Sequence, residues 1–278
     1  MKKISRRSFM AAAAVSVAAL ALTACGGSAS SAASSVASSA ASSEAASSAA
    51  AADLTTVEAG KLTMATNAAF PPYEMTTDAG EFEGIDVDTA KAIAEKLGLE
   101  LQIDDMEFDA ALLSVQQGKA DIVMAGVTVT DERKAVMDFS DSYATGIQSI
   151  IVPNDSDIAS PDDLAGKTIG TQRGTTGYIY CSDDFGDENV VAYDDGLTAV
   201  QALNNGQVDA VVIDNAPAQE FIAANPGLKI LDTSYAEEDY AIGMAKGSSL
   251  EDAVNATLEE LKADGTLQAI VDKYITAE

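Results

Sequence analysis

The residues with the clearest chemical meaning lie in the run Gly-Val-Thr-Val-Thr-Asp-Glu-Arg-Lys at positions 126–134. An apolar strand predicted over 121–125 ends at Gly126, whose missing side chain lets a ligand approach the backbone. Thr128 and Thr130 alternate, so their hydroxyls share one face of an extended chain. Thr130 also suits the N-cap of a short helix that carries two acidic residues in its first turn. This run therefore predicts a strand-to-helix turn that is open to a small ligand.

Arg133 falls on the first turn of that helix, close to backbone N–H groups that no helical carbonyl accepts. A guanidinium beside such donors is a receptor for a carboxylate, because its planar fork binds both oxygens at once. The same residues also allow a surface arginine that pairs with Asp131 or Glu132. Taken alone, this stretch leaves both interpretations open.

The run at 126–134, followed by Asp-Phe-Ser at 138–140, resembles the signature of solute-binding proteins for polar amino acids, the receptors that feed ABC importers. The resemblance extends from about Lys61 to the C-terminus. Further motifs follow the order of this family: Phe70-Pro71-Pro72-Tyr73-Glu74, Gly84-Ile85-Asp86-Val87-Asp88, Gly174-Thr175-Thr176-Gly177 and Asp209 to Asp214. Each motif is weak by itself, whereas the ordered series is specific.

The composition excludes several other functions. The 278 residues contain no His, which removes His-based general bases, Ser-His-Asp triads and His metal sites. Cys25 and Cys181 stand far apart, so we expect no disulfide, and we interpret Cys181 as a half-buried thiol at a helix end. A net charge of −28 argues against binding to nucleic acid. We expect no cofactor, no metal site and no catalytic residue.

The N-terminus predicts export and a lipid anchor. Four basic residues precede an apolar run at 10–22 that is too short for a permanent membrane helix, so residues 1–24 are interpreted as a signal peptide. Leu-Thr-Ala-Cys at 22–25 resembles a bacterial lipobox, which implies a lipid on Cys25; a plain signal peptide with an incidental cysteine is the alternative. The pattern at 5–10 also resembles a twin-arginine signal, so the export route stays open.

A tether and a folded body follow. Residues 25–58 are rich in Ser and Ala and cannot bury a core, so we expect a tether that holds the body off the membrane. Beyond it, predicted strands and helices alternate with short connections, which is typical of an open parallel α/β sheet. We expect Asp86 to cap a helix over 87–97, and one continuous strand over 240–245.

Two lobes are expected from an internal repeat and from the resemblance. The pattern at 117–123, a helix closed by Gly and a strand entered through Asp, recurs at 205–211. The resemblance implies an α/β, two-lobed fold of the type II periplasmic binding proteins, with a ligand cleft outside the strand ends. It gives lobe 1 as 59–143 plus 240–278 and lobe 2 as 144–239, with hinges near 143–146 and 237–240.

The resemblance also implies two half-sites for the backbone of an amino acid. The groups for its α-carboxylate are Arg133 and the N–H groups of Thr128, Thr175 and Thr176. The groups for its α-ammonium are Asp214, the Gly126 carbonyl and the Thr128 hydroxyl. The sequence alone also allows Asp214 as a helix N-cap and Thr128 as an ordinary strand residue.

Four residues are expected to select the ligand side chain: Asn67, Phe70, Phe108 and Gln172. The two aromatic rings could flank the ligand or could belong to the core. Family members that bind cations often carry an acid where Asn67 stands, and a neutral amide removes the partner of a buried cation. Asn67 therefore predicts a polar, uncharged amino acid. Glu74 could still supply a charge, although the family pattern implies a structural role for it.

The resulting expectation is an exported, monomeric receptor on the outer face of the cytoplasmic membrane. A free amino acid would bridge the lobes and favour their closure, and an ABC permease with its ATPase would receive the cargo. One alternative is a lyase on the same fold, of the cyclohexadienyl-dehydratase kind, with Glu74 or Asp214 as the acid. The other is a sensory module that passes its ligand state to a partner.

Overall fold

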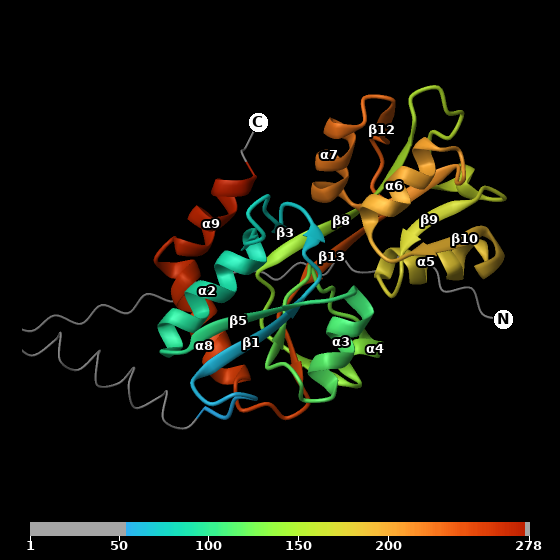
Figure 1. The fold of residues 1–278 in the computed structure, drawn as a ribbon. Helices are drawn as coiled ribbons and strands as arrows, with labels where there is room; N and C mark the ends of the chain where they lie inside the picture. Colours follow the sequence, from blue (N-terminus) through green and yellow to red (C-terminus); the bar gives the residue numbers. More distant parts are fainter. Residues whose placement is uncertain (1–53, 276–278) are drawn as a thin grey trace, which may run out of the picture. The chain divides into compact units, whose positions relative to one another are not determined.

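The computed structural model describes residues 54–275 (Figure 1). The predicted signal peptide, the lipobox cysteine Cys25 and nearly all of the predicted tether lie outside this range. Within the described residues, no helix combines the length and apolar character needed to span a membrane.

The first of two large sheets is built from chain segments at both ends of the described range. Its strands, in spatial order, are β5 (Glu100–Asp105), β1 (Lys61–Thr66), β6 (Ile122–Val123), β14 (Gly243–Ala245) and β7 (Met137–Phe139). β5, β1 and β6 are parallel, whereas β14 runs antiparallel to both of its neighbours. A parallel sheet was expected, and β14 departs from that expectation because the chain returns from the second sheet in the opposite direction.

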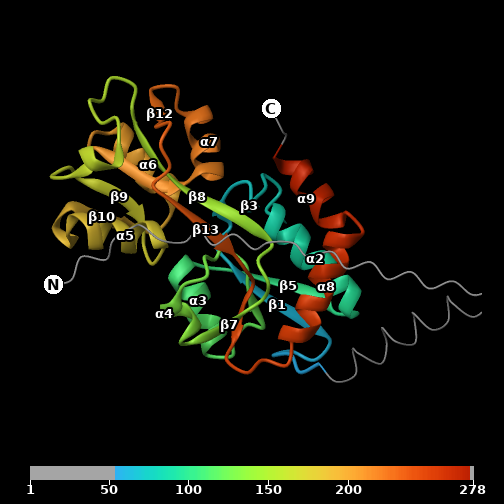
Figure 2. The ribbon, with the colours of Figure 1, turned by 180° about the vertical axis from the view of Figure 1, so that it is seen from behind.

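Helices cover both sides of the first sheet (Figures 1 and 2). On one side lie α2 (Ile85–Leu97), α8 (Glu251–Ala263) and α9 (Thr266–Tyr274), and on the other α3 (Phe108–Gln116) and α4 (Asp131–Lys134). A hydrophobic cluster lies on each face of this sheet, because successive side chains of a strand point to opposite faces. In β6, Ile122 packs in the cluster with α2 and α8, and Val123 packs in the cluster with α3. β6 is thus apolar on both faces, as expected for a strand inside a sheet that is covered on both sides.

The second large sheet comes mainly from the middle of the chain. Its strands are β10 (Val190–Tyr193), β9 (Ile169–Gln172), β11 (Ala210–Asp214), β8 (Ala144–Pro153), β12 (Leu228–Ile230) and β13 (Ala236–Tyr240). Its helices are α5 (Thr176–Phe185), α6 (Gly196–Asn204) and α7 (Asn215–Ala224), with 3-10 turns at Pro161–Leu164 and Asp187–Asn189. Val212 faces α5, and Val211 and Ile213 face the cluster of α6 and α7. A small third sheet holds β2 (Ala69–Phe70), β3 (Glu74–Thr76) and β4 (Phe82–Glu83).

Two paired strands connect the large sheets. β8 and β13 run antiparallel and side by side from the first sheet into the second (Figures 1 and 2), with Ala144 opposite Tyr240 and Gly146 opposite Glu238. The strand predicted over 240–245 is therefore divided, because Tyr240 ends β13 and β14 starts at Gly243. Between them, the Ala241 N–H donates to the Val127 carbonyl.

Two local predictions were wrong for identifiable reasons. Asp86 does not cap α2, which begins at Ile85 after Gly84; its buried carboxylate instead accepts hydrogen bonds from the Gly126 N–H (3.0 Å) and the Tyr143 hydroxyl (2.7 Å). Cys181 is not half-buried at a helix end. It lies within α5, fully buried against the second sheet, and burial raises the pKa of its thiol to about 12.

Candidate ligand-binding site

One cavity gathers all ten residues that the sequence nominated for ligand binding. They are Asn67, Phe70, Phe108, Gly126, Thr128, Arg133, Gln172, Thr175, Thr176 and Asp214. The structure thus places them together, and their roles toward a ligand stay predictions. Five lining residues were not nominated: Glu74, Ala125, Gln148, Val212 and Ile213.

Gly126 lies where the first sheet meets this cavity. Its φ of 55° is left-handed, a conformation that glycine adopts without strain. A Cβ here would lie 2.9 Å from the Phe70 ring and 3.3 Å from the Tyr240 ring. The Phe70 and Tyr240 rings thus occupy the space beside this glycine, and the approach of a ligand to its backbone stays a prediction.

Arg133 is held by the short helix that the sequence predicted. The Thr130 side chain accepts a hydrogen bond from the Arg133 N–H (3.2 Å), which confirms Thr130 as the N-cap of α4. The guanidinium is 8% exposed, donates to the carbonyls of Thr128 (2.8 Å) and Gly174 (3.1 Å), and lies 5.4 Å from the centre of the Phe108 ring. Burial lowers the pKa of Arg133, but a guanidinium stays charged in proteins. Its remaining N–H donors are available for a carboxylate.

Backbone donors converge on the same region. Thr128 lies opposite Tyr240 in an isolated antiparallel bridge, flanked by hydrogen bonds of Val127 and Val129 to the returning chain. Its own N–H and carbonyl therefore point away from that partner, and the carbonyl is the one bound by Arg133. Thr176 is the first residue of α5, so its N–H has no partner within the helix.

Asp214 is the last residue of β11 and lines the cavity from the second sheet. The sequence allowed it as a helix N-cap, but its side chain makes no capping bond to α7. Its carboxylate instead accepts hydrogen bonds from the Gln148 amide (2.7 Å) and from the Tyr240 hydroxyl. Burial raises the pKa of Asp214 to about 7, the Tyr240 bond opposes that rise, and the charge of Glu238 adds to it.

Two amides close the cavity between the sheets. The Gln172 amide donates to the Asn67 side-chain oxygen (2.8 Å), and the Asn67 amide donates to the Met106 carbonyl (3.0 Å). Gln172 belongs to the second large sheet and Asn67 follows β1 of the first, so this hydrogen bond links the two large sheets directly. Neither residue brings a charge to the site.

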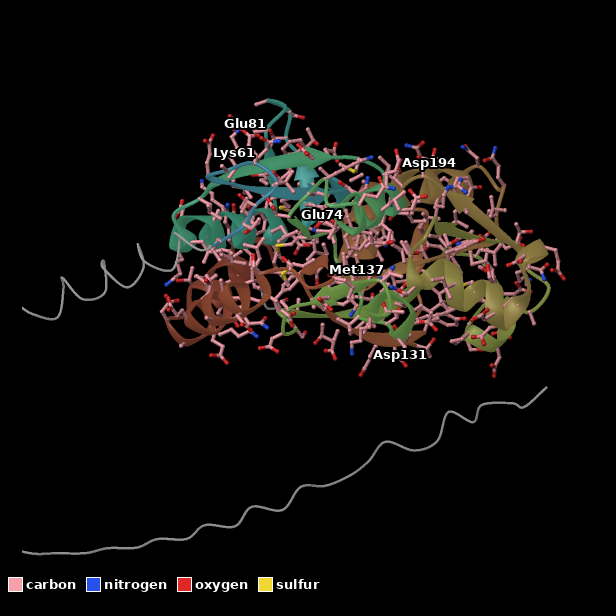
Figure 3. All side chains as sticks on the ribbon, turned by 90° about the horizontal axis from the view of Figure 1, so that it is seen from below. Lys61, Glu74, Glu81, Asp131, Met137 and Asp194 are labelled. Atoms are coloured by element: carbon pink, nitrogen blue, oxygen red, sulfur yellow. The ribbon has the colours of Figure 1, made fainter. Side chains whose placement is uncertain are left out.

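Glu74 forms part of the cavity wall. It is fully buried, and neither of its carboxyl oxygens has a hydrogen-bond partner among the described residues that meets ordinary geometry. Figure 3 shows it inside the folded part, whereas Glu81 projects at its edge. Burial raises the pKa of Glu74 well above its usual range, and the nearby Asp86 charge adds to the rise. Burial in this setting therefore favours the neutral form of the carboxyl.

Sequence motifs missed Gln148, Glu238 and Tyr240, which come from the paired strands β8 and β13. Glu238 stands between two other acidic residues, and nothing in its immediate neighbours separates it from them. Strand periodicity could have found it, because a residue two positions before the buried Tyr240 shares its face.

Comparisons with known proteins agree with this geometry. The family model of bacterial extracellular solute-binding proteins, family 3, matches residues 62–277. The L-cystine-binding protein TcyJ of Escherichia coli is 32% identical over 225 residues, which are 80% of this chain and 85% of that protein. The arginine-binding extracellular protein ArtP of Bacillus subtilis is 33% identical over 228 residues, 78% of this chain and 87% of that protein.

A solved structure extends the comparison to three dimensions. An ancestral arginine-binding protein bound to glutamine superposes with a TM-score of 0.75 and 40% identity, covering 78% of this chain and 99% of that chain. The two-lobed, periplasmic-binding-protein-like fold expected from the sequence is thereby confirmed, and these relatives are binding proteins rather than enzymes.

Proposed function

We propose, from the premise that this chain belongs to family 3 of the bacterial extracellular solute-binding proteins, that it captures a free amino acid for an ABC importer. As a member of that family the chain is a binding protein and not an enzyme, which sets the lyase alternative aside. The observation that carries the proposal is a cavity lined both by an arginine from α4, beside the first sheet, and by a carboxylate at the end of β11 in the second sheet.

The arginine and the carboxylate suit the two charges of an amino acid. Arg133 and the N–H groups of Thr128 and Thr176 would bind the α-carboxylate, because a fork of charged donors beside backbone donors matches two carboxylate oxygens. The N–H of Thr175, predicted as a further donor, instead donates to the Gln172 carbonyl (3.4 Å), so Thr175 would act as the N-cap that holds the start of α5 in place. Asp214, the Gly126 carbonyl and the Thr128 hydroxyl would bind the α-ammonium, which needs acceptors only.

For the ligand side chain we propose a polar, uncharged amino acid. Asn67 and Gln172 offer amide groups without charge, and Phe70 and Phe108 offer apolar ring faces. Burial raises the pKa of Glu74, which favours its uncharged form. The glutamine bound by the ancestral protein is a ligand of this chemical class in a related cavity.

A cationic amino acid is the second candidate, and Glu74 is the observation that favours it. Its carboxyl lines the cavity beside the buried carboxyl of Asp86, and it would become a carboxylate if a guanidinium or ammonium came within reach. Several relatives are named for arginine. The two candidates differ in proton release, since only a cation would drive the proton off Glu74.

The proposal extends to the rest of the chain. Cys25 would carry the lipid that anchors the receptor to the outer face of the cytoplasmic membrane, and residues 25–58 would be the tether. Lobe 1 would comprise 59–143 plus 240–278 and lobe 2 would comprise 144–239, with the protein acting as a monomer beside a permease and its ATPase. A sensory module is the remaining alternative. Genes for a permease and an ATPase beside the gene of this protein would favour the role in transport.

A thermal-shift panel tests the ligand class. The chain from Gly26 onward, unfolded and refolded to remove bound solute, is heated with each of the twenty amino acids, cystine and ornithine. A specific ligand at about 100 times its Kd adds about 2.7 kcal/mol, which corresponds to roughly 5–10 °C for a protein of this size. A shift with glutamine or another neutral polar residue supports the first candidate, and a shift with arginine or lysine selects the second. No shift with any amino acid contradicts the proposal.

A further inference from the structure

Glu238 carries a buried carboxylate that the proposed recognition of an amino acid does not use. It is 6% exposed, lies on the connecting strand β13, and its Oε2 accepts three hydrogen bonds of 3.0 Å each. The donors are the hydroxyls of Thr128 and Thr176 and the amide of Gln148. The Tyr180 hydroxyl also interacts with this carboxyl: burial and the charge of Glu238 raise the pKa of Tyr180 to about 12.

These bonds fix the direction of two hydroxyl groups at the cavity wall. A threonine hydroxyl has one proton, and a carboxylate oxygen can only accept. Because Thr128 and Thr176 both give their protons to Glu238, their oxygens have only lone pairs left for a ligand. Such oxygens bind an ammonium well, and they have no proton to give to a ligand hydroxyl or carbonyl oxygen.

Glu238 also changes the balance of charge in the cavity. Its Oε2 and the Asp214 Oδ2 share the Gln148 amide, at 3.0 and 2.7 Å, so the two carboxyl groups belong to one network. Arg133 is the one cationic side chain among the lining residues. A ligand that has a carboxylate but no ammonium would form an ion pair with Arg133. It would leave the carboxyl groups of Asp214 and Glu238 without a cationic partner.

We propose that Glu238 is a specificity-determining positioning residue, which makes the cavity select a ligand with an α-ammonium over the same molecule without its amino group. It acts through the hydroxyls of Thr128 and Thr176 and through its own charge. The inference rests on the proposed function, because it concerns how the proposed amino-acid receptor recognises one end of its ligand.

The test compares matched pairs of ligands by calorimetric titration and by competition. The pairs are L-glutamine with glutaramate, L-arginine with 5-guanidinopentanoate, and L-cystine with 3,3′-dithiodipropionate. For each pair that the wild type binds, Glu238→Gln is expected to reduce the preference for the amino acid by about tenfold or more, because a charge near the ammonium is lost. The affinity for the analogue without an amino group is expected to stay within about threefold.

Glu237→Gln is the matched control, since it makes the same chemical change at the exposed neighbouring residue. It is expected to leave the preference unchanged. Glu238→Asp keeps the charge on a shorter side chain and is expected to retain most of the preference, which also provides a second variant if Glu238→Gln does not fold.

The outcomes separate the two proposals. A wild type that binds no amino acid of the thermal-shift panel contradicts the proposed function, and this inference with it. If the panel selects an amino acid outside the three pairs, that amino acid and its analogue without the α-amino group form the test pair. A wild type that binds an amino acid of the panel, with the same preference in Glu238→Gln or with both members of the pair weakened equally, contradicts this inference alone. Equal weakening would show that Glu238 only maintains the fold of the cavity.

Discussion

At the scale of single residues, the side chains that line the cavity are held by hydrogen bonds to other groups of the same chain. Arg133 uses two donors on the carbonyls of Thr128 and Gly174, and its plane lies against Phe108. A guanidinium fixed in this way loses little freedom when it binds a carboxylate. The bonds that hold the residue and the bonds proposed for the ligand therefore belong to one preorganised unit.

Arg133→Ala is expected to weaken amino-acid binding by about 2–5 kcal/mol, roughly 30-fold or more, because the α-carboxylate loses its charged partner. Titration calorimetry measures the loss, and circular dichroism checks that the fold is retained. Arg173→Ala is the matched control, since Arg173 is exposed and makes a 3.4 Å ion pair with Asp194. An Arg133→Ala protein that binds within a few-fold of the wild type would remove Arg133 from the site.

Asp214 predicts a pH dependence of binding. Its pKa rises to about 7 in the folded, ligand-free protein from an ordinary value of 3.8, and an ammonium ligand requires its ionised form. Between these values the folded protein holds a proton that the unfolded chain has lost, so this contribution to stability falls as pH rises from about 4 to 7. Affinity is expected to change in the other direction, falling by up to about tenfold for each pH unit below 7.

Calorimetry from pH 5.5 to 8, in buffers that differ in ionisation enthalpy, measures both the affinity and the protons released. Asp214→Asn is expected to bind weakly with little change between pH 6 and 8. An affinity of the wild type that does not vary over this range would mean that Asp214 is ionised before the ligand arrives.

Residues carried by local motifs could be predicted, and residues carried by the connecting strands could not. Arg133, Thr175 and Thr176 stand at strand-to-helix turns, where capping patterns and strand ends are visible in the sequence. Gln148 and Glu238 lie within strands, and their role arises only when β8 and β13 pair. Asp86 was misread because a helix-capping pattern does not reveal that its carboxylate turns inward.

At the scale of elements, the paired strands β8 and β13 are the part of the fold on which the cavity most depends. They supply Gln148, Glu238 and Tyr240, and they join the two sheets. Gly146 of β8 leaves room for the Tyr240 ring, because a Cβ at this position would lie 2.4 Å from that ring. The Tyr240 hydroxyl in turn binds Asp214.

Gly146→Ala is therefore expected to destabilise the protein by about 1–3 kcal/mol, because the added methyl group must displace the Tyr240 ring from a packed site. It is also expected to weaken amino-acid binding, since Tyr240 holds Asp214. Gly227→Ala is the matched control, because a Cβ at Gly227 meets no atom within 4 Å. Urea unfolding measures the difference, and equal midpoints for the two variants would contradict the packing argument.

At the scale of the whole folded body, several contacts cross directly from one sheet to the other. Gln172 donates to Asn67, Arg133 donates to the Gly174 carbonyl, and Glu238 accepts from Thr128. All three hydrogen bonds border the cavity, so a ligand bound there would add further contacts to the parts of the protein built on each of the two large sheets. Ligand binding would thus favour the arrangement in which these two parts are close.

The expected result is a smaller radius of gyration in solution when a saturating amino acid is added, because closure brings these two parts together. Small-angle X-ray scattering measures this change, and Arg133→Ala at the same ligand concentration is expected to show none. Unchanged scattering of the wild type at saturation would contradict closure by the ligand.

The position of β14 has a consequence for how the chain reaches its final fold. β14, at residues 243–245, lies between β6 and β7, which precede it by more than a hundred residues. The first sheet therefore stays divided until the last part of the chain has been made, whereas the strands of the second sheet come from one continuous stretch. Contacts so distant in sequence form slowly. A nascent chain that ends before Gly243 would have unpaired edges at β6 and β7, so the C-terminal segment completes the body that begins the protein.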